Sequence, residues 1–360
     1  MDISAAPIST CPGSAPTRPI SWQARRESSG CRWWSRRTAK RQTALITGID
    51  GFAGSHLCDL LIRRRHIVHG TTRRAVPDQR AELAEGVVTH QVDLLDRARV
   101  ASVVHQVSPG WVFHLAALSS PAASWDDPGG TIATNATMQA NLLDALVQVS
   151  PMPRLLAIGS GDEYGRPSGR TRRLDEDTPL RPITPYGVSK VTQDLLALQY
   201  YLSRELPVIR VRPFNHAGPR QAPQFAIASF AQQIARIELG TQEPRLKVGN
   251  LDARRDFTDV RDIARAYLLA IELGKPGEVY NIGSGKAPRL RDVLTALLKM
   301  TRVEIGLEVD ETRKRAAEAE VYVCDASRFK RLTGWRPQIP LERTLRDTLA
   351  YWRRSERRAA

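Results

Sequence analysis

The chain contains 360 residues, of which 42% are hydrophobic and 25% charged, proportions typical of a folded globular protein and too apolar for a disordered one. No run approaches 18 consecutive apolar residues, which excludes a transmembrane helix, and we expect no secretory signal peptide because the N-terminus lacks an apolar segment. The net charge is +15, but residues 1–41 contribute +6 and residues 353–360 contribute +3. The positive charge that remains in residues 42–352 is moderate and suits an anionic small-molecule substrate. We therefore predict neither a nucleic-acid nor a membrane partner.

The two ends of the chain differ from the rest in composition. Residues 1–41 are rich in Ser, Pro and Arg without periodicity, and we predict that they form a disordered basic extension. Residues 353–360 are predicted to form a basic tail. The four cysteines make neither a CxxC pair nor a cluster with metal-ligand spacing, which predicts a reducing, cytoplasmic location and no metal site. They are Cys11, Cys31, Cys58 and Cys324.

From Thr43 onward, short apolar runs alternate with longer amphipathic runs. The predicted strands are 43–48, 67–72, 87–93, 111–116, 154–160, 207–213 and 279–283. The predicted helices include 54–65, 96–107, 131–149, 187–204 and 259–273. Continuous apolar strands separated by helices indicate an α/β fold, a doubly wound parallel sheet of the Rossmann type, with a smaller C-terminal substrate lobe. We assign residues 42–213 and 259–283 to the Rossmann domain, and 214–258 and 284–352 to the lobe.

A glycine-rich turn joins the first predicted strand to the first predicted helix. It contains Gly48, Asp50, Gly51, Phe52 and Gly54 in the sequence GIDGFAG. Glycines let the backbone approach a pyrophosphate, and the N-terminus of the helix offers N–H donors and the positive end of its dipole. Because the motif follows a strand and opens a helix, it predicts a dinucleotide cofactor bound by these five residues.

The end of the second predicted strand indicates which dinucleotide is bound. An acidic residue there would bind the ribose 2′-hydroxyl of NAD(H), but this chain has Arg73 after two threonines. An arginine suits a 2′-phosphate, so NADP(H) is favoured over NAD(H). By position alone, the residues that end the third and fourth strands are assigned to the same cofactor: Asp93, Leu94, Leu115, Ala116 and Ala117.

A tyrosine and a lysine four residues apart begin the predicted helix 187–204. Tyr186 and Lys190 share one helical face, and a cation beside a phenol lowers the pKa of that phenol. Tyr186 is therefore predicted to act as an acid or base near neutral pH. Ser160 ends the fifth predicted strand and is placed to hydrogen-bond the reacting oxygen.

With these motifs in this order, residues 43–352 resemble the extended short-chain dehydrogenases/reductases that act on nucleotide sugars. The resemblance implies that Ser160, Tyr186 and Lys190 form a triad, with Tyr186 as the acid/base. It implies that Lys190 tunes Tyr186 and, with it, contacts the nicotinamide ribose. Members of this family commonly dimerise through two helices, for which 96–107 and 131–149 are the candidates.

Three downstream stretches resemble the GDP-mannose branch of that family, and within it the GDP-6-deoxy-D-mannose reductases. They are RPFNHAGPRQ at 212–221, KVGNLDARRDFTDVRD at 247–262 and RAAE at 315–318. The last stretch departs from the branch, which usually has proline in place of Ala316. The resemblance implies that an Arg pair holds the diphosphate and that a glutamate faces the guanosine ribose. The substrate residues implied are Asn215, Arg220, Val248, Arg255, Arg315 and Glu318.

The motif GSGDEYG at 159–165 bears on the reaction. By the resemblance, Asp162 stands where the GDP-mannose 4,6-dehydratases carry an essential glutamate, and its shorter side chain disfavours abstraction of the C5 proton. We therefore predict NADP(H)-dependent reduction of GDP-4-dehydro-6-deoxy-D-mannose to GDP-D-rhamnose, with Asp162 as a further catalytic residue. The alternatives are a GDP-mannose 4,6-dehydratase acting on GDP-mannose, alone or as a second activity, another nucleotide-sugar epimerase or dehydratase, and a non-catalytic NADP-binding protein.

Overall fold

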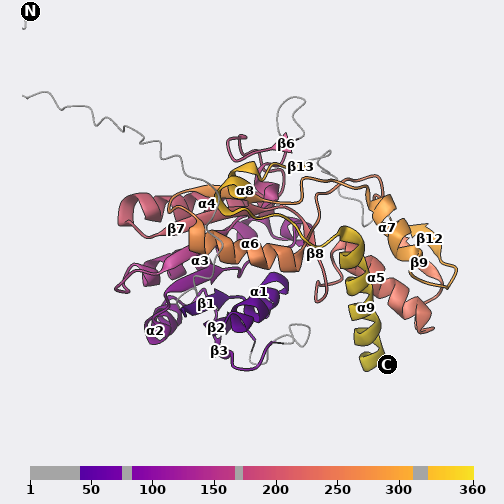
Figure 1. The fold of residues 1–360 in the computed structure, drawn as a ribbon, viewed down its shortest axis with the longest axis horizontal. Coiled ribbons are helices and arrows are strands. Elements are labelled where there is room, and N and C mark those ends of the chain that lie inside the picture. The colour runs from indigo at the N-terminus through magenta and orange to yellow at the C-terminus, as the bar shows by residue number, and fades with distance from the viewer. Residues whose placement is uncertain (1–40, 75–82, 167–172, 311–322) are drawn as a thin grey trace, which may run out of the picture. The chain divides into compact units, whose positions relative to one another are not determined.

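The computed structural model describes residues 41–74, 83–166, 173–310 and 323–360, so the predicted extension 1–41 lies outside the described residues except for Arg41. A seven-stranded sheet has the order β11-β7-β5-β4-β1-β2-β3, and every neighbouring pair is parallel (Figure 1). Its strands are β1 (Thr43–Thr47), β2 (Ile67–Thr72), β3 (Val88–Gln91), β4 (Trp111–His114), β5 (Arg154–Ile158), β7 (Val208–Pro213) and β11 (Val279–Ile282). The predicted doubly wound parallel sheet is confirmed.

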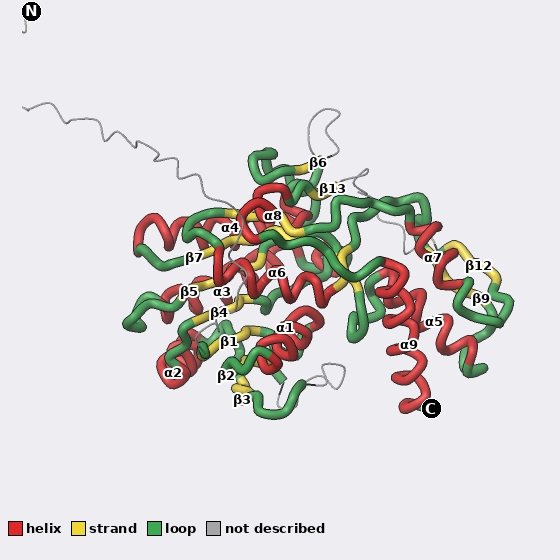
Figure 2. Tube along the Cα trace, viewed as in Figure 1, coloured by secondary structure: helices red, strands yellow, loops and turns green. Residues whose placement is uncertain are grey.

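Helices cover both faces of this sheet (Figure 2). One face packs against α1 (Phe52–Arg63) and α6 (Val260–Leu273), and the other against α2 (Arg97–Val107), α3 (Pro128–Leu146) and α4 (Pro185–Arg204). Successive side chains of a strand point to opposite faces, so Ile46 joins the first core and Leu45 the second. Burial on both faces explains why the strands read as continuous apolar runs.

Helix starts follow capping residues near the predicted boundaries. Thr184 accepts a hydrogen bond from the backbone N–H of Gly187 at 3.0 Å, and Pro185 occupies the first turn, so α4 begins two residues before the predicted start. Asp127 caps α3 in the same way, with Pro128 at its start. The sequence therefore located these helices, and local side chains fixed their ends.

The remaining elements include a second lobe with a core of its own, at the right of Figure 1. It contains α5 (Ala226–Glu238), α7 (Leu290–Leu298), α9 (Leu341–Ala359), and the parallel pair β9 (Arg245–Val248) and β12 (Gly306–Val309). Two short parallel pairs lie elsewhere, β8 (His216–Ala217) with β10 (Thr258–Asp259), and β6 (Arg173–Leu174) with β13 (Val323–Cys324). The 3₁₀ turns are η2 (Ala123–Trp125) and η3 (Gly161–Glu163). No described helix is both long and apolar enough to cross a membrane.

Two segments lie elsewhere than the sequence analysis placed them. Helix α8 (Ser327–Thr333) was assigned to the substrate lobe, but Phe329 and Trp335 are buried in the core between the sheet and α6. Residues 353–359 continue α9 instead of forming a separate tail, because Arg353 donates to both carboxylate oxygens of Glu238 and its neighbour Trp352 packs in the lobe core. Both segments are held by packing against distant parts of the chain.

The packing of α8 predicts the effect of a truncation. Phe329→Ala removes a fully buried ring that contacts Tyr280 and Trp335, and should lower the free energy of unfolding by about 3–5 kcal/mol. Urea denaturation followed by circular dichroism measures this change. Leu273→Ala, at a side chain 46% exposed at the end of α6, is the control and should stay within about 0.5 kcal/mol of the parent. Equal, small effects of the two changes would show that α8 is not part of the sheet core.

Candidate active site

A cleft of about 1280 Å³ lies at the carboxyl ends of β1, β4, β5 and β7, and its far side is formed by the lobe. In a doubly wound sheet, this edge is where ligands bind. Most of the predicted site residues line the cleft. They are Gly48, Asp50, Gly51, Phe52, Gly54, Arg73, Asp93, Leu94, Leu115, Ala116, Ala117, Ser160, Asp162, Tyr186, Lys190, Asn215 and Arg255.

The glycine turn at one end of the cleft requires its glycines. Gly48 has a left-handed φ of +67°, and a Cβ there would lie 3.0 Å from the Cα of Ala116. A Cβ on Gly54 would lie 2.4 Å from the carbonyl oxygen of Gly48. Helix α1 starts at Gly51 without a capping side chain, so no side chain covers its N-terminus. The cradle is open enough to admit a pyrophosphate.

Beside the turn, the end of β2 carries basic residues. Asp50 accepts a hydrogen bond from the hydroxyl of Thr72 at 2.8 Å, which ties the glycine turn to β2. Arg73 and Arg74 follow Thr72, and both are exposed and line the cleft. Two guanidinium groups at this position favour a ligand that carries an additional phosphate there.

Ser160 and Tyr186 meet in the middle of the cleft. Ser160 ends β5 and caps η3, and its side chain is hydrogen-bonded to the phenol of Tyr186. Burial raises the pKa of Tyr186, and the nearby charge of Asp162 adds to that rise, whereas the bond to Ser160 opposes it. The phenol therefore keeps its proton at neutral pH and can donate it.

Lys190 lies one helical turn beyond Tyr186, with Nζ 6.0 Å from the centre of the tyrosine ring. Its ammonium donates to the carbonyl oxygen of Ile158 at 2.9 Å and to Oε1 of Gln193 at 2.9 Å. Burial lowers the pKa of Lys190 to about 8. The expectation that this cation lowers the pKa of Tyr186 is wrong for the chain by itself, because burial and Asp162 dominate the environment of the phenol.

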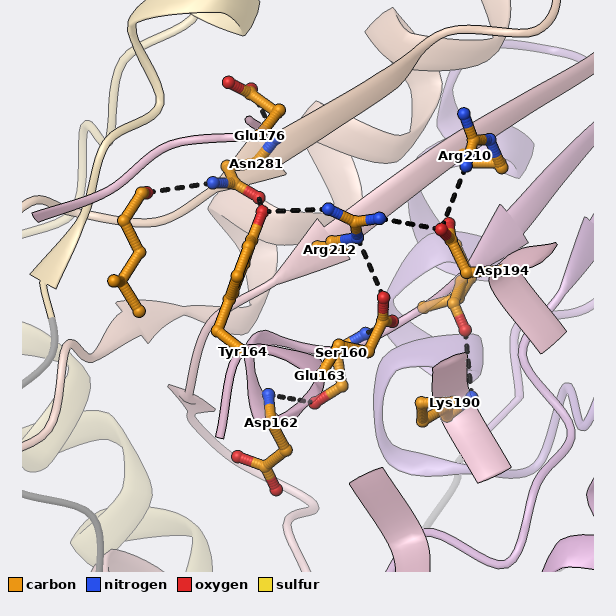
Figure 3. Close-up of polar contacts among 12 residues, drawn as sticks. Ser160, Asp162, Glu163, Tyr164, Glu176, Lys190, Asp194, Arg210, Arg212 and Asn281 are labelled. Carbon is orange, nitrogen blue, oxygen red and sulfur yellow. Dashed lines mark hydrogen bonds and ion pairs between the residues drawn. The ribbon is translucent and has the colours of Figure 1, made fainter. Parts of the chain in front are cut away.

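Buried charged side chains form a network that includes a hydrogen bond to the backbone of Ser160 (Figure 3). Oε1 of Glu163 accepts from the backbone N–H of Ser160 at 2.7 Å, and its Oε2 lies 2.8 Å from Nε of Arg212. Nη2 of Arg212 lies 2.7 Å from Oδ2 of Asp194, which also accepts from Arg210 at 2.9 Å. Burial raises the pKa of Glu163, and Arg212 opposes that rise. The network joins β7, α4 and η3, three elements that line the cleft.

Arg212 also connects this network to β11, the edge strand beside β7 (Figure 3). Its Nη1 donates to the hydroxyl of Tyr164 at 3.1 Å, and that hydroxyl donates to Oδ1 of Asn281 at 2.7 Å. The backbone N–H of Asn281 donates to Glu176 at 2.8 Å. The sequence analysis assigned no such roles, because a buried charge looks the same in a single sequence as an exposed one.

The remaining substrate residues implied by the resemblance lie in different environments. Val248 is buried in the lobe core and does not line the cleft, although the adjacent residues 249–251 do. Arg220 is outside the lining and pairs with Asp59 of α1 at 2.9 Å. Arg315 and Glu318 lie outside the described residues.

Several cleft residues have no counterpart in the sequence analysis. His216 stacks on the predicted cofactor residue Phe52, with ring centres 5.6 Å apart, where the glycine turn meets the lobe. Phe225 and Ala226, at the start of α5, line the cleft together with Asn250. They come from loops whose meeting point no local sequence pattern reveals. Among the described residues, no three His, Cys, Asp or Glu side chains form a group that could hold a metal ion.

Comparison with known proteins adds a family to this geometry. The family model described as GDP-mannose 4,6 dehydratase matches residues 45–348. The chain is 34% identical over 311 residues to GDP-6-deoxy-D-mannose reductase of Pseudomonas aeruginosa, covering 86% of this chain and 97% of that protein. It is 27% identical to GDP-mannose 4,6-dehydratase of Yersinia enterocolitica, covering 85% of this chain and 92% of that protein.

Solved structures share the fold over nearly the same span. The structure of RMD from Pseudomonas aeruginosa complexed with NADPH matches with a TM-score of 0.76 and 33% identity, covering 88% of this chain and all of that one. UDP-glucose 4-epimerase of Thermus thermophilus in complex with NAD matches with a TM-score of 0.78 and 26% identity, covering 86% of this chain and 99% of that one. Cofactor-bound relatives therefore share this architecture.

The ion pair of Arg220 predicts a structural effect in place of the implied substrate role. Arg220→Met leaves Asp59, whose side chain is only 18% exposed, without its partner, and should lower the free energy of unfolding by about 1.5–3 kcal/mol. Urea denaturation measures this, and isothermal titration with GDP should show less than about a twofold change in affinity. Arg255→Met, which removes a cation from the cleft lining, is the contrasting variant and should weaken GDP binding instead. If Arg220→Met instead lost much of its affinity for GDP at unchanged stability, Arg220 would be a substrate residue, as the resemblance implies.

Proposed function

Since this chain belongs to the GDP-mannose 4,6 dehydratase family, we propose that it is an NADP(H)-dependent reductase that converts GDP-4-dehydro-6-deoxy-D-mannose to GDP-D-rhamnose. The observation that carries the proposal is the buried phenol of Tyr186, hydrogen-bonded to Ser160 and holding its proton, in the same cleft as the glycine turn. The reductase relative supports it, because it is 34% identical across nearly its whole length. Dehydratases of the same family are 25–28% identical.

NADP(H) fits the residues at the glycine turn. Added Cβ atoms on Gly48 and Gly54 would collide with the backbone of Ala116 and of the turn itself, so only glycines allow this tight turn, and the N-terminus of α1 suits the pyrophosphate. Arg73 and Arg74 suit the 2′-phosphate that distinguishes NADPH from NADH. The P. aeruginosa RMD structure, which contains NADPH, supports this choice. When bound, this cofactor supplies the hydride for the sugar.

The chain's own residues supply orientation and a proton. Ser160 and Tyr186 polarise the C4 carbonyl by donating hydrogen bonds to its oxygen, and Tyr186 then transfers its proton to the alkoxide oxygen. Arg255 offers a cation to the diphosphate from the lobe side of the cleft. Asp162 contributes by keeping Tyr186 protonated before the reaction.

The residue at position 162 favours a reductase over a dehydratase. A 4,6-dehydratase must first oxidise C4, which requires a base to remove the hydroxyl proton, and must then remove the C5 proton with a carboxylate. Asp162 stands where the dehydratases are expected to carry a glutamate, and its side chain, shorter by about one methylene, disfavours removal of the C5 proton. A reductase needs only hydride delivery and protonation of the C4 oxygen.

Parallel assays of the two substrates test the proposal. With GDP-4-dehydro-6-deoxy-D-mannose and NADPH, the protein should consume NADPH and form a GDP-deoxyhexose that chromatography and NMR identify as GDP-D-rhamnose. With GDP-mannose and no added NADPH, it should form no 4-keto product. The reverse pattern would make the chain a dehydratase, and activity in both assays would make it bifunctional.

The proton donor gives a sharper test. Tyr186→Phe should reduce turnover about 10²–10⁴-fold, the usual contribution of a positioned acid, while NADPH binding persists. Tyr201→Phe, on the same helix but outside the cleft lining, is the matched control and should keep parental turnover. Steady-state kinetics with the ketosugar measure both variants. Near-parental turnover of Tyr186→Phe would remove Tyr186 from this role.

We infer that the protein is a homodimer in the cytoplasm. Val188, Leu195 and Leu202 lie seven residues apart along α4 with exposures of 38%, 52% and 70%, and they form an apolar stripe. Helix α4 packs on α3, so α3, which is the predicted helix 131–149, suits the interface together with α4 in place of the predicted helix 96–107. Cys58 and Cys324 are free and buried, which supports a reducing compartment.

The dimer proposal predicts the effect of charge on the stripe. The double variant Leu195→Glu and Leu202→Glu should be monomeric, because an interface cannot bury two unpaired carboxylates. Light scattering after size-exclusion chromatography measures the mass. Leu273→Glu, at a side chain 46% exposed at the end of α6, is the control and should leave the dimer intact. A dimer that survives the double change would place the interface elsewhere.

A further inference from the structure

A chain of buried polar groups joins the cleft wall to Lys190. The backbone N–H of Ala116, in the cleft lining, donates to Oγ1 of Thr47 at 3.2 Å. The same oxygen lies 2.8 Å from Nδ1 of His114, and Nε2 of His114 lies 3.3 Å from Nε2 of Gln193. Oε1 of Gln193 then accepts from Nζ of Lys190 at 2.9 Å. Thr47, His114 and Gln193 are all at most 2% exposed.

The surroundings fix which way the carboxamide of Gln193 points. Its Nε2 donates to the carbonyl oxygen of Asn135 at 3.0 Å, and it faces the acceptor nitrogen of His114. Burial and the charge of Lys190 lower the pKa of His114 to about 3, so its imidazole is neutral. An ammonium can only donate, so the oxygen of Gln193 faces Lys190 and its amide nitrogen faces Asn135 and His114. Nε2 of the neutral His114 ring is then the acceptor, and Nδ1 carries the proton toward Thr47.

Lys190 is consequently held by neutral acceptors. An ammonium group has three N–H donors, of which Ile158 and Gln193 take two, and this leaves one for the cleft. The titratable groups that face it are Glu163 from η3, Tyr186 from its own helix and His114 from β4. Gln193 is thus the side chain that accepts directly from the buried ammonium, while the charge of Glu163 favours the ammonium from η3.

We propose that Gln193 is a positioning residue, whose oxygen keeps Lys190 charged, directs its third N–H toward the cofactor and so sets the highest pH at which NADPH is held. This rests on the proposed function in so far as Lys190 contacts the cofactor. Gln193 does not line the cleft and acts only through Lys190. Thr47 and His114 act indirectly, because they hold the orientation of the Gln193 carboxamide.

The sign of the pH effect follows from the charge of Lys190. Burial lowers the pKa of Lys190 to about 8, so the ammonium is present below pH 8 and is lost above it. A carboxylate at position 193 would favour the ammonium and move this limit to higher pH. An apolar side chain would remove an acceptor and move the limit to lower pH. A purely structural role would move neither limit.

The experiment measures NADPH binding by fluorescence titration from pH 6 to pH 10 for the full chain and three variants. Binding to the parent should fall by half near pH 8. Gln193→Glu should move that midpoint up by about one unit, and Gln193→Leu should move it down by about one unit, a tenfold change in proton affinity in each case. Gln139→Leu is the matched control, because Gln139 is as deeply buried and donates to the backbone oxygen of Gln193 and not to its carboxamide.

Each outcome decides the proposal. Opposite shifts of the Glu and Leu variants support it, with the Gln139 variant at the parental midpoint. Equal midpoints for all four proteins overturn it, as does a shift of the same size in Gln139→Leu. If the Leu variant fails to fold, the upward shift of the nearly isosteric Gln193→Glu decides alone. Because cofactor binding needs no turnover, a protein that shows these shifts but reduces no ketosugar would contradict only the proposed function.

Discussion

The ion pairs of Arg212 with Glu163 and Asp194 hold the catalytic cleft together. Arg212 belongs to β7, Asp194 to α4 and Glu163 to η3, so one guanidinium fixes three elements that each carry a cleft residue. All three side chains are at most 5% exposed, and removing one partner of such a buried pair typically costs about 3–5 kcal/mol. The positions of Ser160 and Tyr186 relative to each other depend on this constraint.

Burial moves the pKa values of Tyr186 and Lys190 in opposite directions. Burial and the charge of Asp162 favour the neutral phenol of Tyr186, whereas the ammonium of Lys190 donates to uncharged acceptors and is favoured by the charge of Glu163. A phenol that keeps its proton is suited to protonating an alkoxide, and an ammonium close to its pKa responds to small changes in its surroundings. The two residues of the YxxxK motif therefore have separate supports, Ser160 and Asp162 for the tyrosine and Gln193 for the lysine.

The Rossmann side and the lobe side of the cleft differ in how much of their structure the sequence predicted. The Rossmann side follows from alternating apolar strands and amphipathic helices, because strands that follow one another in the chain mostly lie next to one another in the sheet. The lobe side is built from segments that precede and follow α6 in the chain. Helix α8, which lies between β12 and α9 in the chain, packs in the sheet core instead. Composition alone could not separate α8 from the lobe, because Phe329 and Trp335 suit either core.

The sequence by itself determined the parts of the protein that depend on near neighbours. The glycine turn, the spacing of Tyr186 and Lys190 and the strand-helix alternation are all properties of short segments, whose geometry local sterics dictate. Only the tertiary structure decided the partners of buried polar groups. His114 meets Thr47 from 67 residues away and Gln193 from 79, and Arg220 meets Asp59 across 161. A polar group needs such a partner because folding removes it from water. Which groups are removed from water depends on how distant segments pack together, so it cannot be deduced from one segment.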